Sequence, residues 1–200
     1  MHNSNIQWLK TRRSIRRYKS EPVPSVMINQ ILQAAIWAPS AHNRQPWRFV
    51  VIERPSTKMK LAAAMGAKLR ADLSADGMSP DLIEKDSNRS FQRITNAPIL
   101  ILLCLTMGDM DSYPDSRRQQ NEKMMAIQSV ALAGQNLLLA AHSLGLGACW
   151  MCAPLFCPQV VVDTLHLPSD WEPQALISVG YPDEAKEKTR HSLEGRVLWR

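Results

Sequence analysis

The sequence predicts a mixed-sheet α+β layer fold. Apolar segments of strand length, such as 49–52, 99–105 and 175–179, alternate irregularly with segments whose apolar residues recur at helical spacing. This order lacks the regular strand–helix repeat of a doubly wound parallel sheet. The chain has 200 residues, 45% hydrophobic and 21% charged, which suits one globular domain covering 1–200.

The first quarter of the chain predicts a helix, a strand and the start of a second helix. Ser25 can cap a helix whose apolar residues fall at i, i+3, i+4, i+7 and i+8. Pro39 ends this helix, because a proline ring cannot continue it. Residues 49–52 form a strand, and Ser56 can cap a helix that extends to about Leu73.

The middle of the chain contains the two most apolar elements. A Ser-Pro pair begins a helix over 79–95. Residues 99–105 are apolar on both faces and predict a central strand. A polar excursion, 107–120, precedes one long helix over 122–143, which is apolar nearly all round and is therefore expected in a core or an interface.

The last third predicts two short strands around a short helix. Gly145 is the expected C-cap of the long helix. Residues 148–151 form a strand, 158–165 a helix and 175–179 a further strand. The tail from 184 is charged.

The net charge of +6 is concentrated in two clusters far apart in the sequence. The cationic residues are Arg12, Arg13, Arg16 and Arg17 around Ser14, and Lys186, Lys188 and Arg190. Each cluster could be a solvated basic segment. Together they could clamp one phosphate group, because arginine forks bind phosphate oxygens in bidentate fashion. A nucleic-acid-binding module is a weaker alternative, because aromatic residues do not interleave with the basic ones.

The loop APSAHNRQPW, residues 38–47, carries more polar side chains than a plain helix-to-strand connection needs. Pro39 forces an extended chain, and Ser40 and Asn43 offer both donors and acceptors. Such groups suit the edge of a flat heteroaromatic ring. The alternative is a turn that is closed by local side-chain hydrogen bonds.

Four cysteines lie in apolar sequence and predict reduced, buried thiols in a cytoplasmic protein. Cys149, Cys152 and Cys157 resemble metal ligands in spacing, but their segment is strand-like and apolar, so no metal is expected. The longest apolar run is too short to span a membrane, and the start of the chain has no secretory h-region. No Gly-rich dinucleotide fingerprint or Walker lysine is present, and the order of the residues gives no support for a hydrolase triad.

Four motifs resemble the nitroreductase family of flavin enzymes. They are RRSIRRY, APSAHNRQPWRFVVIE, AGQNLLLAAHSLGLGACW, and VGYP followed by Lys188-x-Arg190. The resemblance extends from Arg12 to about Val197. It implies a nitroreductase-like three-layer fold with a mixed, mostly antiparallel sheet flanked by helices, in an intertwined homodimer that binds FMN at its interface.

The resemblance also implies roles for particular residues. The FMN phosphate and ribityl chain would be held by Arg12, Arg13, Ser14, Arg16, Lys188 and Arg190. The flavin ring would be lined by Pro39, Ser40 and Asn43 of the partner subunit. The backbone from Met151 to Leu155 would approach flavin N5; Pro154 has no N–H, so this contact falls to Leu155 or is lost.

The activity implied by the family is electron transfer from NADH or NADPH, through FMN, to a small acceptor such as a nitroaromatic or a quinone. No catalytic side chain is required, because the flavin carries the chemistry. Some segments more closely resemble the reductase domain fused to the glutamate ligase of deazaflavin coenzyme biosynthesis. In that alternative, a larger anionic substrate would be faced by Arg70, Asp72 and the loop from Tyr113 to Arg118. A flavin-binding protein without turnover is a further alternative.

Overall fold

One antiparallel sheet forms the centre of the computed structural model, which describes residues 4–200. The strands, in their order across the sheet, are β1 (Trp47–Ile52), β2 (Ile99–Leu105), β4 (Glu172–Gly180) and β3 (Gly147–Met151). All three strand pairs are antiparallel. In the described residues, parallel pairing is limited to an isolated bridge between Ser14 and Ala148. The prediction of a mostly antiparallel sheet is therefore confirmed.

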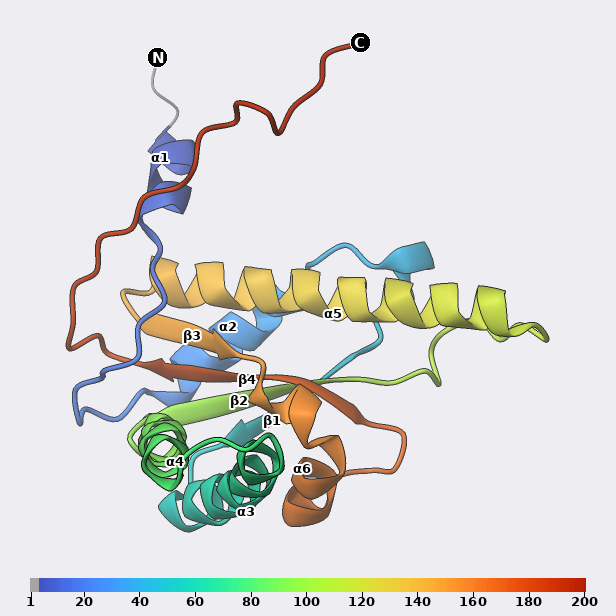
Figure 1. Ribbon diagram of the computed structural model, residues 1–200. Coiled ribbons are helices and arrows are strands. Elements are labelled where there is room, and N and C mark those ends of the chain that lie inside the picture. The colour runs from blue at the N-terminus through green and yellow to red at the C-terminus, as the bar shows by residue number, and fades with distance from the viewer. Residues whose placement is uncertain (1–3) are drawn as a thin grey trace.

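Helices cover both faces of the sheet, as Figure 1 shows. On one face lie α2 (Ser25–Ala35) and α5 (Ser116–Ser143); on the other lie α3 (Pro55–Ala75), α4 (Pro80–Thr95) and α6 (Pro158–Leu165). Every residue of β2 is buried, and its side chains alternate between the two faces. Ile101 and Leu103 pack in the core on the α5 side, whereas Leu100 and Leu102 pack on the α3 side. The predicted three-layer fold is confirmed.

The long helix α5 lies against the sheet for much of its length. Buried residues from Ala126 to Ala141 form its inner face. Among residues 4–200, α5 is the one helix long and apolar enough by composition to cross a membrane. Its packing on β2 and β3 is that of a core helix.

Several predicted helix starts are wrong by a few residues. α2 begins at Ser25 itself and α3 at Pro55, so neither Ser25 nor Ser56 is an N-cap. α5 begins at Ser116, within the predicted polar excursion, because the Asp115 side chain accepts a hydrogen bond from the backbone amide of Arg118 at 2.9 Å. The first turns of α5 can therefore be polar and still helical, because the Asp115 cap satisfies a backbone amide at the helix start.

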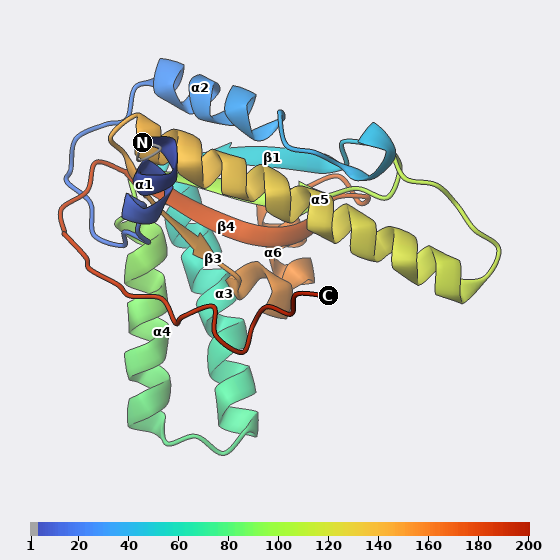
Figure 2. The ribbon, with the colours of Figure 1, turned by 90° about the horizontal axis from the view of Figure 1, so that it is seen from above.

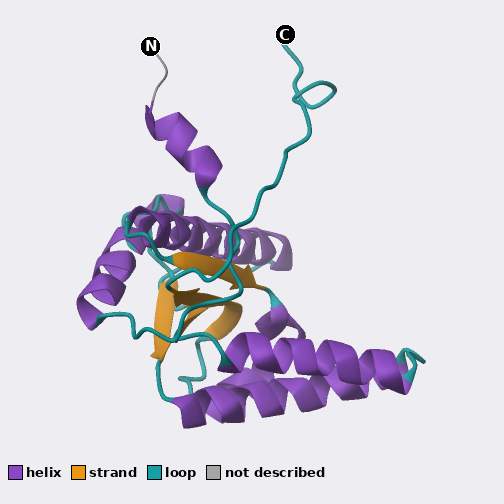
Figure 3. Ribbon diagram, turned by 90° about the vertical axis from the view of Figure 1, so that its left-hand side faces the viewer, coloured by secondary structure: helices purple, strands orange, loops and turns teal. Residues whose placement is uncertain are grey.

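Three short elements were not predicted. They are α1 (Ser4–Thr11), η1 (Ala41–Asn43) and η2 (Ala153–Phe156). No residue of α1 is buried, and α1 stands off the body on the same side as the C-terminal tail (Figure 3). They span eight, three and four residues, which is too short for a clear apolar periodicity.

Candidate functional site

The two ends of the chain meet beside strand β3. The backbone amide of Ile15 donates to the carbonyl of Ala148 at 3.0 Å, and the amide of Asp183 donates to the carbonyl of Arg17 at 3.0 Å. The predicted C-cap Gly145, with φ of 75°, turns the chain from α5 into β3. A Cβ on Gly147 would lie 2.7 Å from Ile15 side-chain atoms, so this approach requires a glycine.

Glu184 fastens the N-terminal segment to the tail. Its side chain is only 4% exposed. It accepts hydrogen bonds from the backbone amide of Arg16 at 2.6 Å and from Nζ of Lys186 at 2.8 Å, and it pairs with Nε of Arg17 at 3.2 Å. Desolvation raises the pKa of Glu184, but these partners outweigh it and lower the pKa to about 2.

The junction encloses a cationic cavity of about 150 Å³. It is lined by Arg12, Arg13, Ser14, Arg16, Lys186, Lys188 and Arg190, with no carboxylate among them. An adjoining cavity of about 530 Å³ is shared by Arg12, Arg13, Lys188 and Arg190 with residues of α1. Burial and the neighbouring charges of Arg190 and Arg13 lower the pKa of Arg12. The structure therefore brings together the two basic clusters that the sequence separates by more than 160 residues.

Arg13 differs from the other cations of this group. Its Nη1 donates to the carbonyls of Lys10 at 2.5 Å and Arg12 at 2.8 Å, so the side chain folds back on the end of α1. Its Nε is buried and has no hydrogen-bond partner among the described residues. A buried guanidinium donor without a partner is suited to an incoming anion.

The loop that contains Pro39, Ser40 and Asn43 lies toward the other end of α5. The amide of Ala41 donates to Oγ of Ser129, whereas the N-terminal segment meets α5 at His142, through Oγ1 of Thr11. These two contact points are separated by 13 residues, or about 20 Å of helix. Figure 2 shows the same separation of α1 from the light-blue loop after α2.

The end of β3 leads into η2, where the predicted flavin-edge residues lie. Met151 is half-buried and Pro154 is buried, whereas Leu155 is 49% exposed. The backbone amide of Leu155 donates to the carbonyl of Cys152 at 3.0 Å. This bond engages the Leu155 amide inside η2, which favours the alternative in which a flavin N5 contact from this segment is lost.

The two predicted substrate residues lie on the α3–α4 hairpin, which projects from the body (Figure 2). Arg70 makes a bidentate ion pair with Glu84, with Nε–Oε2 at 3.1 Å and Nη2–Oε1 at 3.2 Å. Asp72 pairs with Lys68 one turn earlier on α3. Both residues already stabilise the hairpin in this structure.

The cysteines are all free, and three of the four are buried. Burial raises the pKa of Cys104 to about 12 and raises the pKa of Cys149 and of Cys157. The prediction of a buried thiol is wrong for Cys152, which is exposed and accepts a hydrogen bond from Nε1 of Trp150 at 3.2 Å. Residues 4–200 contain no group of three or more potential metal ligands.

Sequence reasoning missed two residues of this region. Glu184 was assigned to a solvated charged tail, and nothing in its local sequence distinguishes it from Glu187. Arg93, in the last turn of α4, lies near Arg16; burial together with Arg16 and Arg89 lowers the pKa of Arg93. Basic residues are common in the last turn of a helix, where they interact favourably with the helix dipole. The position of Arg93 in the sequence therefore does not mark it as part of a binding site.

Solved structures of similar proteins share this architecture. A candidate nitroreductase from Desulfovibrio desulfuricans, solved in complex with FMN, is 28% identical with a TM-score of 0.76, and covers 100% of this chain and 98% of its own. A BluB-like flavoprotein from Clostridium difficile has a TM-score of 0.80 at 24% identity, with 98% of each chain covered, which shows the fold alone. The shared fold and the match to the family model define an oxidoreductase of the nitroreductase class.

The chain belongs to the nitroreductase family, whose model matches residues 9–181. An NADH dehydrogenase from Thermus thermophilus is 32% identical over 94% of this chain and 92% of its own length. A candidate NAD(P)H nitroreductase of Bacillus subtilis, YfhC, is 28% identical over 94% of this chain and 90% of its own length. The family predicted from the four sequence motifs is confirmed.

Proposed function

We propose that this protein is an FMN-dependent oxidoreductase that takes electrons from NADH or NADPH and passes them to a small acceptor such as a nitroaromatic or a quinone. The observation that supports this proposal is the cationic cavity between the two chain ends. It combines six basic side chains with the Ser14 hydroxyl and contains no acidic lining residue.

This set of donors fits the phosphate of FMN. A phosphate monoester carries about two negative charges at neutral pH, and paired guanidinium and ammonium groups neutralise them. Arg12, Arg190 and Lys188 would hold the phosphate, and Ser14 and Arg16 the adjoining ribityl chain. Enclosure by both chain ends favours a small, compact anion over a nucleic-acid backbone, which would need a continuous basic surface.

The chain's own residues bind and orient the cofactor, whereas FMN supplies the hydride acceptor and the two-electron donor. Cationic side chains near the cavity, Arg16 and Arg93 among them, favour added negative charge on a bound ring. The apolar Leu155 and Phe156 beside η2 are exposed and suit a flat ring. No acidic or basic side chain is assigned to the chemical step.

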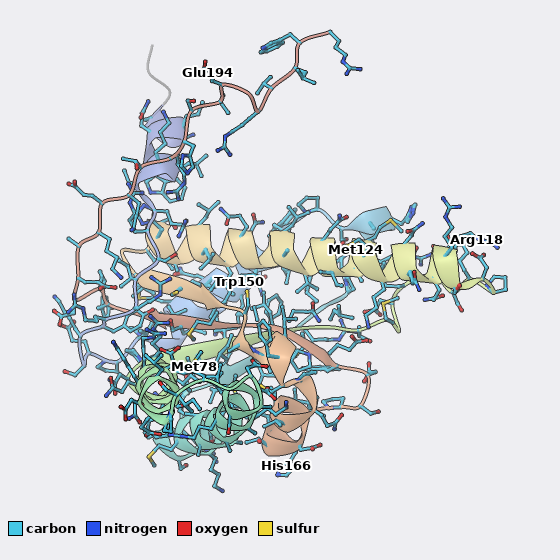
Figure 4. The ribbon with its side chains drawn as sticks, viewed as in Figure 1. Met78, Arg118, Met124, Trp150, His166 and Glu194 are labelled. Carbon is cyan, nitrogen blue, oxygen red and sulfur yellow. The ribbon has the colours of Figure 1, made fainter. Side chains whose placement is uncertain are left out.

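The protein acts as a homodimer in this proposal. Large apolar side chains are exposed on α1, in η2 and on the tail, including Leu9, Phe156, Leu198 and Trp199. The tail runs far from the body, where Figure 4 labels Glu194. A second copy would cover these surfaces and would bring its Pro39, Ser40 and Asn43 to the ring.

The deazaflavin alternative loses support from the structure's ion pairs. It required Arg70 and Asp72 to face an anionic substrate, but both pair with charged neighbours inside the hairpin. A deazaflavin that is reduced by the protein, or that perturbs the spectrum of bound FMN, would restore it.

The test is flavin retention by a variant of the cavity. The purified protein should be yellow, and NADH or NADPH should bleach it in the absence of oxygen. The double variant Arg12→Ala/Arg190→Ala should lose FMN, since two of the phosphate's charged partners are removed. Full flavin occupancy in that variant would refute the phosphate assignment, and Lys60→Ala, a remote surface charge, is the control.

A further inference from the structure

The loop 40–46 has an unusual backbone. Three of its residues that are not glycine have left-handed conformations: His42 with φ of 48°, Asn43 with φ of 55° and Gln45 with φ of 53°. Such conformations cost free energy and persist only where the surrounding structure holds them. They gather at ligand-binding sites, so the contacts that hold this loop are of functional interest.

Hydrogen bonds already hold much of the loop backbone, since the amide of Asn43 donates to the carbonyl of Ser40 at 3.0 Å and the amide of Arg44 to the carbonyl of Ala41 at 2.9 Å. Oγ of Ser40 accepts from the amide of Gln45 at 3.1 Å, and Oδ1 of Asn43 accepts from Nε2 of Gln45 at 3.3 Å. The amide of Ala41 donates to Oγ of Ser129 on α5 at 3.2 Å. The local side-chain hydrogen bonds of the predicted turn are therefore present. The side chains of His42 and Arg44, however, have no partner within the loop among the interactions described.

A second segment, 106–111, fastens the loop from outside. Arg44 makes an ion pair with Asp111. Arg48 pairs with Asp109, with Nη2–Oδ2 at 2.7 Å. The amide of Thr106 donates to the carbonyl of Pro46 at 2.9 Å. Two aspartates of one segment thus meet two arginines that bracket the entry into β1.

Glu122 of α5 anchors this second segment. Oε1 of Glu122 accepts from the backbone amide of Asp111 at 3.1 Å, and the side chain is fully buried. The other oxygen, Oε2, has no hydrogen-bond partner among the described residues. A buried carboxylate is costly unless it is hydrogen-bonded, and the hydrogen bond that Glu122 accepts comes from the segment that fastens the loop.

We propose that Glu122, Asp111 and Arg44, together with Asp109 and Arg48, form a positioning network that holds the loop 40–46 in the shape that meets the flavin ring. The network begins on the rigid helix α5 and ends on the loop's own cation. Its ion pairs come from outside the loop, and they add to the hydrogen bonds that hold the left-handed residues in place. The inference rests on the proposed FMN function, but the shape of the loop can be measured without FMN.

The test compares Asp111→Asn and Arg44→Gln with the unmodified chain in two measurements. Amide hydrogen exchange of residues 40–46, recorded without FMN, should become faster. The dissociation constant for FMN, from fluorescence titration, should rise about threefold to fivefold, the effect expected for loss of one partly exposed ion pair. The control is Glu84→Gln, which removes a similarly exposed ion pair with Arg70 (Nε–Oε2 3.1 Å) on the projecting α3–α4 hairpin.

A pair of conservative variants separates positioning from general damage. Arg44→Lys keeps the charge opposite Asp111, and Glu122→Gln keeps an accepting oxygen for the Asp111 amide, so both should retain slow exchange in the loop. Unchanged exchange and unchanged FMN affinity in Asp111→Asn would overturn the proposal, and so would faster exchange with unchanged affinity. If neither the unmodified chain nor the variants bind FMN, faster exchange in Asp111→Asn would still support the network, and the proposed FMN function would be refuted.

Discussion

Glu184 shows how a single side chain can determine the geometry of the candidate site. It is the buried carboxylate at which the N-terminal segment and the tail meet, through Arg16, Arg17 and Lys186. The cavity's own cations repel one another, so the junction needs a negative charge placed outside the cavity lining. Glu184 provides that charge without occupying the place of the expected phosphate.

Replacing Glu184 by glutamine should therefore destabilise the junction. Loss of charge-assisted hydrogen bonds is expected to reduce the free energy of unfolding by roughly 1–3 kcal/mol at neutral pH. Because the folded pKa of about 2 is below the ordinary value of 4.5, this contribution is complete above about pH 4.5 and is lost as pH falls toward 2. Urea denaturation at a series of pH values measures it.

The difference between the unmodified chain and Glu184→Gln should shrink on acidification. Glu187→Gln, an exposed change on the same tail, controls for the loss of one negative charge. A difference that stays constant from pH 7 to pH 3 would show that the Glu184 charge does not hold the junction.

At the scale of elements, the close contact between the N-terminal segment and β3 decides where the basic residues lie. The bridge from Ser14 to Ala148 fixes the register, and Gly147 leaves space for Ile15. Arg12 and Arg16 reach the cavity because this segment is held flat against the strand.

Gly147→Ala should displace that segment. The added methyl group would lie 2.7 Å from Cβ of Ile15, which is close to the backbone and cannot rotate away. Overpacking of this kind costs about 1–3 kcal/mol, and FMN affinity should fall with stability. Gly66→Ala is the control, because it also lacks a positive φ and its added methyl group would meet only the flexible end of the Arg70 side chain, at 3.3 Å. Equal losses of FMN affinity in the two variants would count against the contact.

The elements that could be predicted were those with strong apolar periodicity. β2 and α2 were found from their apolar patterns, and the distribution of charge gave the two basic clusters of the cavity. The short elements α1, η1 and η2 were missed, because they carry few buried residues and depend on contacts from distant parts of the chain. Glu184 and the Glu122–Asp111–Arg44 network were missed for the same reason: each depends on a pairing that only the fold creates.

At the scale of the whole molecule, the two halves of the proposed site lie apart in one chain. The phosphate cavity lies at one end of α5, and the loop with Ser40 and Asn43 lies about 20 Å along the helix. A second copy that crosses the exposed apolar surfaces would place its loop over the first copy's cavity.

A mixed dimer tests this arrangement directly. One subunit would carry Arg12→Ala/Arg190→Ala, and the other would carry Ser40→Ala/Asn43→Ala; each homodimer should bind FMN poorly. If the loop serves the partner's cavity, the mixed dimer contains one site with an intact cavity and an intact loop, so it should bind one FMN per dimer with affinity near that of the unmodified protein. If each loop served its own chain's cavity, both sites of the mixed dimer would be damaged. Differently tagged subunits, purified together and titrated with FMN, distinguish the two cases, and a mixed dimer with no tight site would refute the shared site.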